Sequence, residues 1–294
     1  MKSRHSYFRK ILYSITIPLL MIPVLGSCSK KPDMIRPTPR VENGGDFDFV
    51  SPDINKVGFY DPSTKIWRMK TGNTWSASVN YLGWGPDEGG WTPVIGDWDN
   101  DGVDEVGFYD PATNIWRMRT GNTWSDSVNY LVWGPDGGGW TPVTGDWDND
   151  GIDEVGFYDP ATKIWRMKEE NTGSGSVSYL LWGPDGGGGT PVIGDWDNDG
   201  IDEVGFYDPA TKIWRMKEEN TWNGSVSYLL WGPDGGGLTP VTGDWDDDGV
   251  DEVGFYDPAT KVWRMKKENT WSAMVEYLFW GSDGGGWDPI SGSW

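Results

Sequence analysis

Alternating acidic side chains in a short segment are the strongest chemical signal in the sequence. Asp97, Asp99 and Asp101 are followed by Gly102 and, three residues later, by Glu105, in the pattern D-x-D-x-D-G-x-x-E. Alternate spacing in a tight loop turns three carboxylates toward one centre, and the glycine permits the sharp turn that brings the next backbone carbonyl beside them. Hard oxygen ligands in this number suit Ca²⁺, so the segment predicts a calcium loop.

Other cations fit this ligand set less well. Mg²⁺ usually takes fewer protein ligands in stricter octahedral geometry, and transition metals favour His or Cys. The chain has one residue of each type, His5 and Cys28, both near its N-terminus. The alternative is a set of solvated acidic hairpins without a metal, in which neither the alternation nor the glycine would be required.

The segment returns at Gly145, Gly194 and Gly243, so about four Ca²⁺ ions are expected. An earlier, degraded copy has Asp48, Val50, Pro52 and Lys56 at the ligand positions and is expected to bind no ion. The intact loops hold nearly as many acids as the net charge of −21, and bound cations would relieve their mutual repulsion. One more acid precedes each Glu, with a role that stays open: Asp104, Asp153, Asp202 and Asp251.

Composition excludes several function classes. The strong negative charge argues against nucleic-acid binding, which needs Lys and Arg to neutralise phosphates. Beyond Cys28 and His5 the chain has no residue for a disulfide, a thiol nucleophile or an imidazole base. A carboxylate pair could still catalyse, as in glycosidases, but every acidic cluster is repeated in the same setting and none is singled out. The chain is therefore not expected to be an enzyme.

A repeat of 49 residues must position these loops. The glycine that opens the acidic segment recurs at Gly96, Gly145, Gly194, Gly243 and Gly292 without insertion. Within one copy, residues 94–98, 105–109, 115–119 and 128–133 are short, rich in β-branched and aromatic residues, and bounded by turn residues. The repeat therefore predicts four strands per copy and no helix outside the N-terminal segment.

Five such copies predict an all-β fold, a five-bladed β-propeller of four-stranded blades over residues 46–294. An open all-β solenoid is the alternative, although its repeats are usually shorter. Residues 287–294 repeat the opening of a copy and stop after its first strand. Residues 290–294 are therefore expected to complete blade one and close the ring, with residues 46–50 as the competing strand and a frayed tail as the other possibility.

The loops and their repeat resemble the FG-GAP and VCBS-type repeats of integrin-α-like propellers, whose calcium loops have the form D-x-D-x-D-G-x-x-D at a strand hairpin. The resemblance covers residues 46–294, and it departs from the family pattern in having Glu at the last position. Whether that Glu binds the ion directly or through water stays open. The resemblance assigns ligand roles to Asp97, Asp99, Asp101, Val103 (carbonyl), Glu105, Asp146, Asp148, Asp150, Ile152 (carbonyl), Glu154, Asp195, Asp197, Asp199, Ile201 (carbonyl), Glu203, Asp244, Asp246, Asp248, Val250 (carbonyl) and Glu252.

The N-terminal segment predicts export. A basic start precedes an apolar run over residues 11–25 that is too short to span a bilayer comfortably. The residues LGSC, ending at Cys28, look like a bacterial lipobox, so residues 1–28 are expected to be a lipoprotein signal peptide with Cys28 as the lipidated residue. Polar, Pro-rich residues 29–45 would form a disordered tether. The protein is then expected on a bacterial membrane, at the cell surface or outer membrane.

Tryptophan recurs at up to five positions per copy. Trp98, Trp116 and Trp133 are expected in the blade core, whereas Trp124 and Trp140 are expected in loops, where exposed aromatics can stack on sugar rings. Copy three has glycine at both loop positions, Gly173 and Gly189. The weak ligand-binding candidates are Trp75, Trp91, Trp124, Trp140, Trp222, Trp271 and Trp287.

These features together predict a calcium-binding, surface-anchored β-propeller, expected to be a monomer, that acts as an extracellular binding or adhesion module. Its ligand would be a surface or extracellular molecule, either glycan or protein. A multivalent lectin-like carbohydrate-binding protein and a structural spacer without ligand are the alternatives.

Overall fold

A computed structural model describes residues 54–87, 89–135, 138–184, 188–233, 237–282 and 286–294. The predicted signal peptide, Cys28, the tether and residues 46–53 lie outside the described residues. Within the described ranges all twenty regular elements are β-strands, in agreement with the expected all-β class. None of the described residues belongs to a helix long and apolar enough to cross a membrane.

The strands form five antiparallel sheets of four strands each, which are the blades. Blade 1 consists of β20 (Asp288–Gly292), β1 (Lys56–Asp61), β2 (Ile66–Lys70) and β3 (Val79–Gly83). Blade 2 consists of β4 (Thr92–Gly96), β5 (Glu105–Asp110), β6 (Ile115–Arg119) and β7 (Val128–Val132). Blade 3 consists of β8 (Thr141–Gly145), β9 (Glu154–Asp159), β10 (Ile164–Lys168) and β11 (Val177–Leu181). Blade 4 consists of β12 (Thr190–Gly194), β13 (Glu203–Asp208), β14 (Ile213–Lys217) and β15 (Val226–Leu230). Blade 5 consists of β16 (Thr239–Gly243), β17 (Glu252–Asp257), β18 (Val262–Lys266) and β19 (Val275–Phe279).

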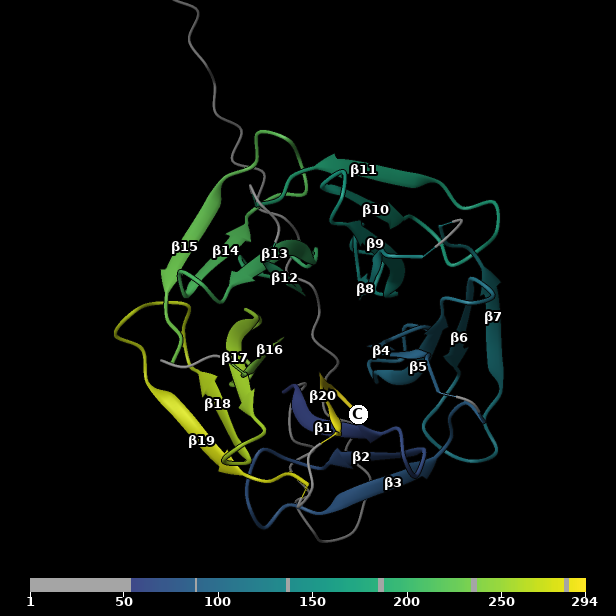
Figure 1. The fold of residues 1–294 in the computed structure, drawn as a ribbon, viewed down its shortest axis with the longest axis horizontal. Coiled ribbons are helices and arrows are strands. Elements are labelled where there is room, and N and C mark those ends of the chain that lie inside the picture. Colours follow the sequence, from purple (N-terminus) through teal and green to yellow (C-terminus); the bar gives the residue numbers. More distant parts are fainter. Residues whose placement is uncertain (1–53, 88, 136–137, 185–187, 234–236, 283–285) are drawn as a thin grey trace, which may run out of the picture. The chain divides into compact units, whose positions relative to one another are not determined.

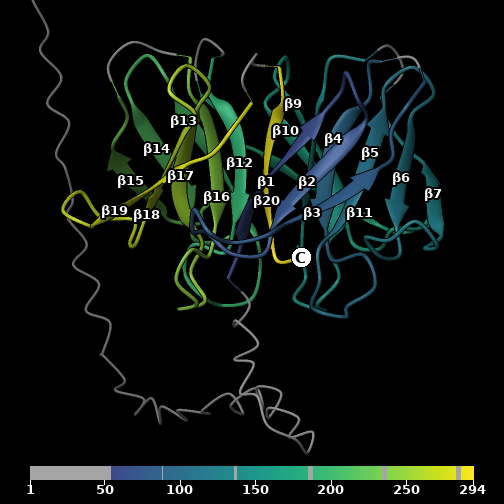
Figure 2. The same ribbon diagram turned by 90° about the horizontal axis from the view of Figure 1, so that it is seen from below.

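The blades surround a central axis as a five-bladed β-propeller (Figure 1). The innermost strands β20, β4, β8, β12 and β16 neighbour one another around that axis and enclose a cavity of about 310 Å³. Because the strands of a blade are antiparallel, the turns after the first and third strands lie at one end of the molecule (Figure 2). We name this the acidic end, since it carries the Asp-rich loops, and we name the opposite end, with the links between blades, the link end.

The hydrophobic core lies between the blades. All six residues of β5 are buried, because this second strand of its blade has neighbours on both faces. Phe157 of blade 3 packs against Tyr109, Trp116 and Trp133 of blade 2, with ring centroids 4.9, 5.1 and 5.0 Å apart. Aromatic pairs at such distances add to the free energy gained from area burial alone. One blade therefore cannot complete its core without the next.

The ring closes as the sequence predicts. β20 pairs with β1, with Gly58 opposite Ile290, and no described strand of another segment competes for that edge. Trp294 Nε1 donates a hydrogen bond to the carbonyl of Lys70 at 2.9 Å. The backbone N–H of Ser293 donates to the carboxylate of Asp104 in blade 2 at 2.7 Å. The C-terminal strand is thus joined both to its own blade and to the next one.

The innermost strands end two residues earlier than the expected 94–98. β4 ends at Gly96 because Asp97 begins the acidic loop, where its carboxylate accepts hydrogen bonds from the backbone N–H groups that follow. Trp98 is nevertheless only 7% exposed, so its expected place in the core is confirmed although it lies outside the strand. Trp116 is fully buried, and Trp133 is half-buried against the same core.

Candidate functional site

The acidic loop of blade 2 turns around the side chain of Asp97. One carboxylate oxygen accepts hydrogen bonds from the N–H groups of Asp99 at 3.3 Å and Asp101 at 3.2 Å, and the other accepts from Gly102 at 2.8 Å. Asn100 and Gly102 have φ angles of 60° and 84°, the left-handed region that glycine and asparagine tolerate best. The backbone thus folds so that alternate carboxylates face one centre.

The structure brings acidic residues of all four loops together as clusters that could hold a metal ion. In each cluster one carboxylate oxygen from each residue lies within 4.8 Å of those of the other two. The clusters are Asp97, Asp99 and Asp101; Asp146, Asp148 and Glu154; Asp195, Asp197 and Asp199; and Asp244, Asp246 and Asp248. The predicted aspartates meet as expected in three of the loops, and in the second loop Glu154 takes part in the cluster while Asp150 does not. The other final glutamates, Glu105, Glu203 and Glu252, lie outside their clusters.

The final glutamates are almost completely buried. Glu105, Glu154, Glu203 and Glu252 are each 1% exposed, and three of them have one carboxylate oxygen without a hydrogen-bond partner: Glu105, Glu154 and Glu252. Burial, followed by the charge of Asp99, raises the pKa of Glu105 from 4.5 to about 8. The same causes, with Asp197 as the neighbour, raise the pKa of Glu203 to about 9. An unpartnered buried carboxylate beside other acids is unfavourable unless a cation or a proton neutralises it.

The donor set fits a hard cation. Each loop offers several carboxylates and a backbone carbonyl, all oxygen, and none of the described residues is His or Cys. In blade 1 the position of the final Glu is taken by Lys56, which is 9% exposed. Among the described residues, blade 1 has no acidic cluster, and Asp48, Val50 and Pro52 of the degraded copy lie outside the described residues.

The acids that precede each Glu have a structural role that the sequence left open. Asp153 of blade 3 accepts a hydrogen bond at 2.9 Å from the backbone N–H of Asp97 in blade 2. The same bond recurs around the axis, and at the last junction Asn55 replaces the acid and accepts from Asp244 at 2.7 Å. Burial raises the pKa of Asp104 to about 6. The signal for this role was the acceptor kept at one position in all five copies.

A second bond joins neighbouring acidic loops directly. The side-chain amide of Asn100 donates to the backbone carbonyl of Asp150 in the next loop at 2.9 Å. Asn149 and Asn198 make the equivalent bonds at 3.0 and 2.9 Å. The loops are therefore held in a connected row along the acidic end, which limits how far one can move without the next.

The tryptophans predicted in loops fall into two groups. Four lie at the acidic end in the turns after the third strands and are 77% to 83% exposed: Trp75, Trp124, Trp222 and Trp271. The other three lie in the links between blades and are half-buried against the core: Trp91, Trp140 and Trp287. The first group is available to a ligand, whereas the second mainly completes the packing.

The outer strands expose further aromatic residues that were not predicted as part of a ligand surface. A tyrosine in each is 62% to 68% exposed: Tyr81, Tyr130, Tyr179, Tyr228 and Tyr277. Trp124 of blade 2 lies close to the outer strand of blade 1, since a Cβ placed on Gly83 would be 3.2 Å from its ring. The alternation of polar and aromatic residues in the fourth strands was the available signal.

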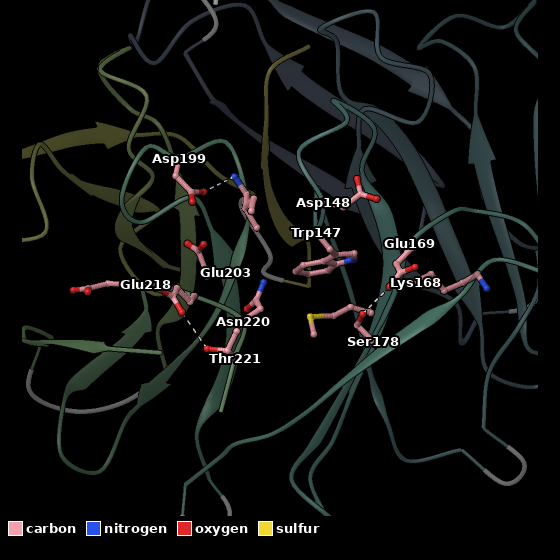
Figure 3. Close-up of a pocket in the computed structure, with 13 residues that line it drawn as sticks. Trp147, Asp148, Lys168, Glu169, Ser178, Asp199, Glu203, Glu218, Asn220 and Thr221 are labelled. Carbon is pink, nitrogen blue, oxygen red and sulfur yellow. Dashed lines mark hydrogen bonds between the residues drawn. The ribbon is translucent and has the colours of Figure 1, made fainter. Parts of the chain in front are cut away.

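A cavity of about 370 Å³ opens between blades 3 and 4 at the acidic end (Figure 3). Trp147, Asp148 and Glu169 of blade 3 face Asp199 and Glu203 of blade 4 across it. The cavity therefore adjoins two of the acidic clusters, and its polar lining is mostly negative.

No protein-family model matches this sequence, and a comparison with curated proteins gives no match.

Proposed function

We propose that the protein is a calcium-binding β-propeller that serves as an exported, surface-anchored binding module. The observation that carries the calcium assignment is the acidic cluster in each of the four loops, beside a buried glutamate that in three loops has an unpartnered oxygen. Four acidic clusters of this kind call for about four ions. Several oxygen ligands at flexible positions favour Ca²⁺ over Mg²⁺.

The same set of residue positions would hold the ion in each of the four loops, as the loop of blade 2 illustrates. Asp97, Asp99 and Asp101 would supply side-chain oxygens, Val103 its carbonyl, and Glu105 the buried oxygen that lacks a partner. The ion would supply the positive charge that these acids need. We expect the affinity of an extracellular module, roughly 10⁻⁴ to 10⁻³ M.

Isothermal titration calorimetry and native mass spectrometry test this assignment. The wild-type protein should bind close to four Ca²⁺ ions, and Asp99→Asn should remove one of them without affecting the others. Asp87→Asn is the matched control, since Asp87 is fully exposed at the link end and pairs with Lys65 at 2.6 Å. A protein that binds no Ca²⁺, or a variant that loses none, would contradict the proposal.

A second candidate function is multivalent carbohydrate binding at the acidic end. It is favoured by the four loop tryptophans with 77% to 83% exposure, because exposed indoles can stack on sugar rings. Weak sites repeated around a ring gain apparent affinity when one polymer engages several of them. A glycan array with and without chelator would separate this function from binding of a protein ligand and from a spacer role.

The variants for that array follow from the two groups of tryptophan. Trp124→Ala and Trp222→Ala should weaken retention on a polymer at least tenfold while leaving the melting temperature unchanged. Trp140→Ala should instead lower the melting temperature, because this side chain packs against the core. Loss of folding in the first pair, or no binding by the parent protein, would exclude the carbohydrate function.

The membrane anchor is tested separately, since Cys28 lies outside the described residues. Metabolic labelling with a fatty acid should mark the wild-type protein and not Cys28→Ser. The variant should also be released from the membrane fraction. Unlabelled wild-type protein would contradict the lipoprotein assignment and leave the calcium proposal unaffected.

A further inference from the structure

The link end holds an aromatic slot that is filled by the chain's own tryptophan in three blades. Trp140, in the link before blade 3, lies under the guanidinium of Arg166, whose Cζ is 3.8 Å from the ring centroid. The edge of Phe157 meets the same indole at 5.6 Å and 65°. Trp91 and Trp287 lie in equivalent slots, with Arg Cζ atoms at 3.8 and 3.9 Å. The slot is therefore shaped for one indole ring.

Blade 4 keeps the walls of this slot but lacks the indole. Gly189 stands where Trp140 stands in the preceding copy. Phe206 occupies the same place as Phe157, since its ring lies 4.9, 5.1 and 5.2 Å from the three aromatic rings of the preceding blade. A Cβ placed on Gly189 would be 3.1 Å from both Phe206 and Pro184, so these two side chains lie close against the glycine and would shift slightly to admit a side chain at this position.

The side chains around Gly189 are more exposed than their equivalents in the filled slot. Arg215 is 25% exposed, whereas Arg166 under its tryptophan is 17% exposed. Asp208 is 19% exposed and Asp159 is 8%. Pro184 is likewise half-buried, although the equivalent Pro135 is buried. We name the hollow formed by Pro184, Gly189, Phe206, Asp208 and Arg215 the blade-4 notch.

The guanidinium of Arg215 is poorly satisfied in this notch. Its Nη1 has no hydrogen-bond partner, and it lies 3.7 Å from the carboxylate of Asp208, beyond hydrogen-bond distance. Arg166 in the filled slot has the same unpartnered Nη1, 3.8 Å from Asp159, so this feature belongs to both slots and leaves the guanidinium face free for a ring in either. In blade 5 the equivalent of Gly189 is Leu238, which packs against the core and fills part of the space. Among the described links, the one before blade 4 is therefore the one in which a side chain is missing altogether.

We propose that the blade-4 notch binds the indole ring of a tryptophan presented by another polypeptide. A guanidinium plane attracts the face of an aromatic ring, and Phe206 can make an edge-to-face contact with the same ring. A pyranose has no π face for the guanidinium to attract, so the blade-4 notch favours an aromatic ring over a sugar ring. The net charge of −21 favours a partner whose tryptophan lies in a basic segment. This site is separate from the acidic loops and from the exposed tryptophans, and it does not depend on calcium.

The probe is 5-fluoroindole, followed by ¹⁹F NMR on the full-length chain so that the protein's own tryptophans do not interfere. We expect one site of millimolar affinity, and about a tenfold gain for a lysine-flanked tryptophan peptide over free indole. Gly189→Trp should weaken binding at least tenfold by filling the notch. Trp140→Gly should create a second site and double the stoichiometry.

Further variants keep the proposal falsifiable if the first ones fold poorly. Gly189→Leu copies the natural residue of blade 5 and should also weaken binding, and melting temperature checks that each variant is folded. Binding that is unchanged in folded Gly189→Trp and Gly189→Leu would overturn the proposal. Absence of any indole binding, or binding of glucose in preference to indole, would overturn it as well.

Discussion

In blades 2 to 5 the two ends differ in how their acidic side chains are neutralised. At the link end of blade 2, Asp110 lies 3.5 Å from Arg117 and accepts hydrogen bonds from Thr113 and Ala112. Burial alone would raise the pKa of Asp110, but these bonds and the charge of Arg117 outweigh it and lower the pKa. At the acidic end, burial and neighbouring acids leave Glu105 with its pKa raised. The chain therefore neutralises one end itself, and we propose that an outside cation neutralises the other.

The largest effect on stability is expected from deleting the C-terminal strand β20, which pairs with β1 and closes the ring. Deleting residues 287–294 removes β20 and the indole of Trp287, and it exposes the edge of β1. Because a propeller depends on closure, the melting temperature should fall by more than about 10 °C, or the protein should fail to fold. Differential scanning calorimetry measures this, with Trp287→Ala as a control that keeps the strand. A truncated protein that melts within a degree of the parent would show that another segment supplies the strand.

Removal of calcium should have the next largest effect on the melting temperature. This effect should arise at the acidic end alone. At a free Ca²⁺ concentration ten times the dissociation constant, each site would contribute about 1.4 kcal/mol of stability. Chelation should therefore lower the melting temperature by roughly 10 °C. A chelator that leaves the melting temperature unchanged would contradict the metal assignment.

A substitution at the link end should have a smaller effect that is independent of calcium. Arg117→Ala leaves Asp110 buried without its cation and uncovers the face of Trp91, so we expect a loss of about 2 to 3 kcal/mol. The loss should be the same with calcium and with chelator. Arg117→Lys should recover part of it, since a cation is restored without the flat guanidinium. A loss that depends on calcium would mean that the two ends are coupled.

The smallest expected effect is that of pH on the melting temperature of the calcium-free protein. The pKa of Glu105 and of Glu154 is raised from 4.5 to about 8 in the folded protein, so these groups favour folding in their protonated form. In chelator their contribution should be complete below about pH 4.5 and should be lost as the pH rises toward 8. The melting temperature of the chelated protein should therefore fall by a few degrees between pH 5 and 8. With saturating calcium this decrease should disappear, and a Glu105→Gln variant should show less of it.

Much of the fold was predictable because the repeat is regular. The spacing of 49 residues and the incomplete last copy predicted five blades and a closing strand, and both are confirmed. The innermost strands were placed two residues late, because Trp98 looks like a strand residue although Asp97 already turns the chain. The acidic clusters were predictable from spacing alone, whereas the identity of the ion stays a prediction.

What could not be predicted depends on contacts between blades. The bond from Asp97 to Asp153 joins residues of neighbouring copies, and nothing in one copy indicates that this acid faces its neighbour. The difference in burial between the two groups of loop tryptophans also depends on contacts between blades, since Arg166 of blade 3 covers the ring of Trp140 in the link before it. The absence of tryptophan at Gly189 was visible in the sequence, but its meaning required knowing that the arginine and phenylalanine around it stay in place.

The closing strand also has a consequence for biogenesis. Trp294 bonds to a residue 224 positions earlier in the chain, so the first blade remains incomplete until β20 has emerged. Pairing across such a sequence distance is slow, and a chain that waits for it exposes an unpaired strand edge. For the exported protein that we propose, the same delay would favour passage across a membrane in an unfolded state, because the ring closes only once β20 reaches β1.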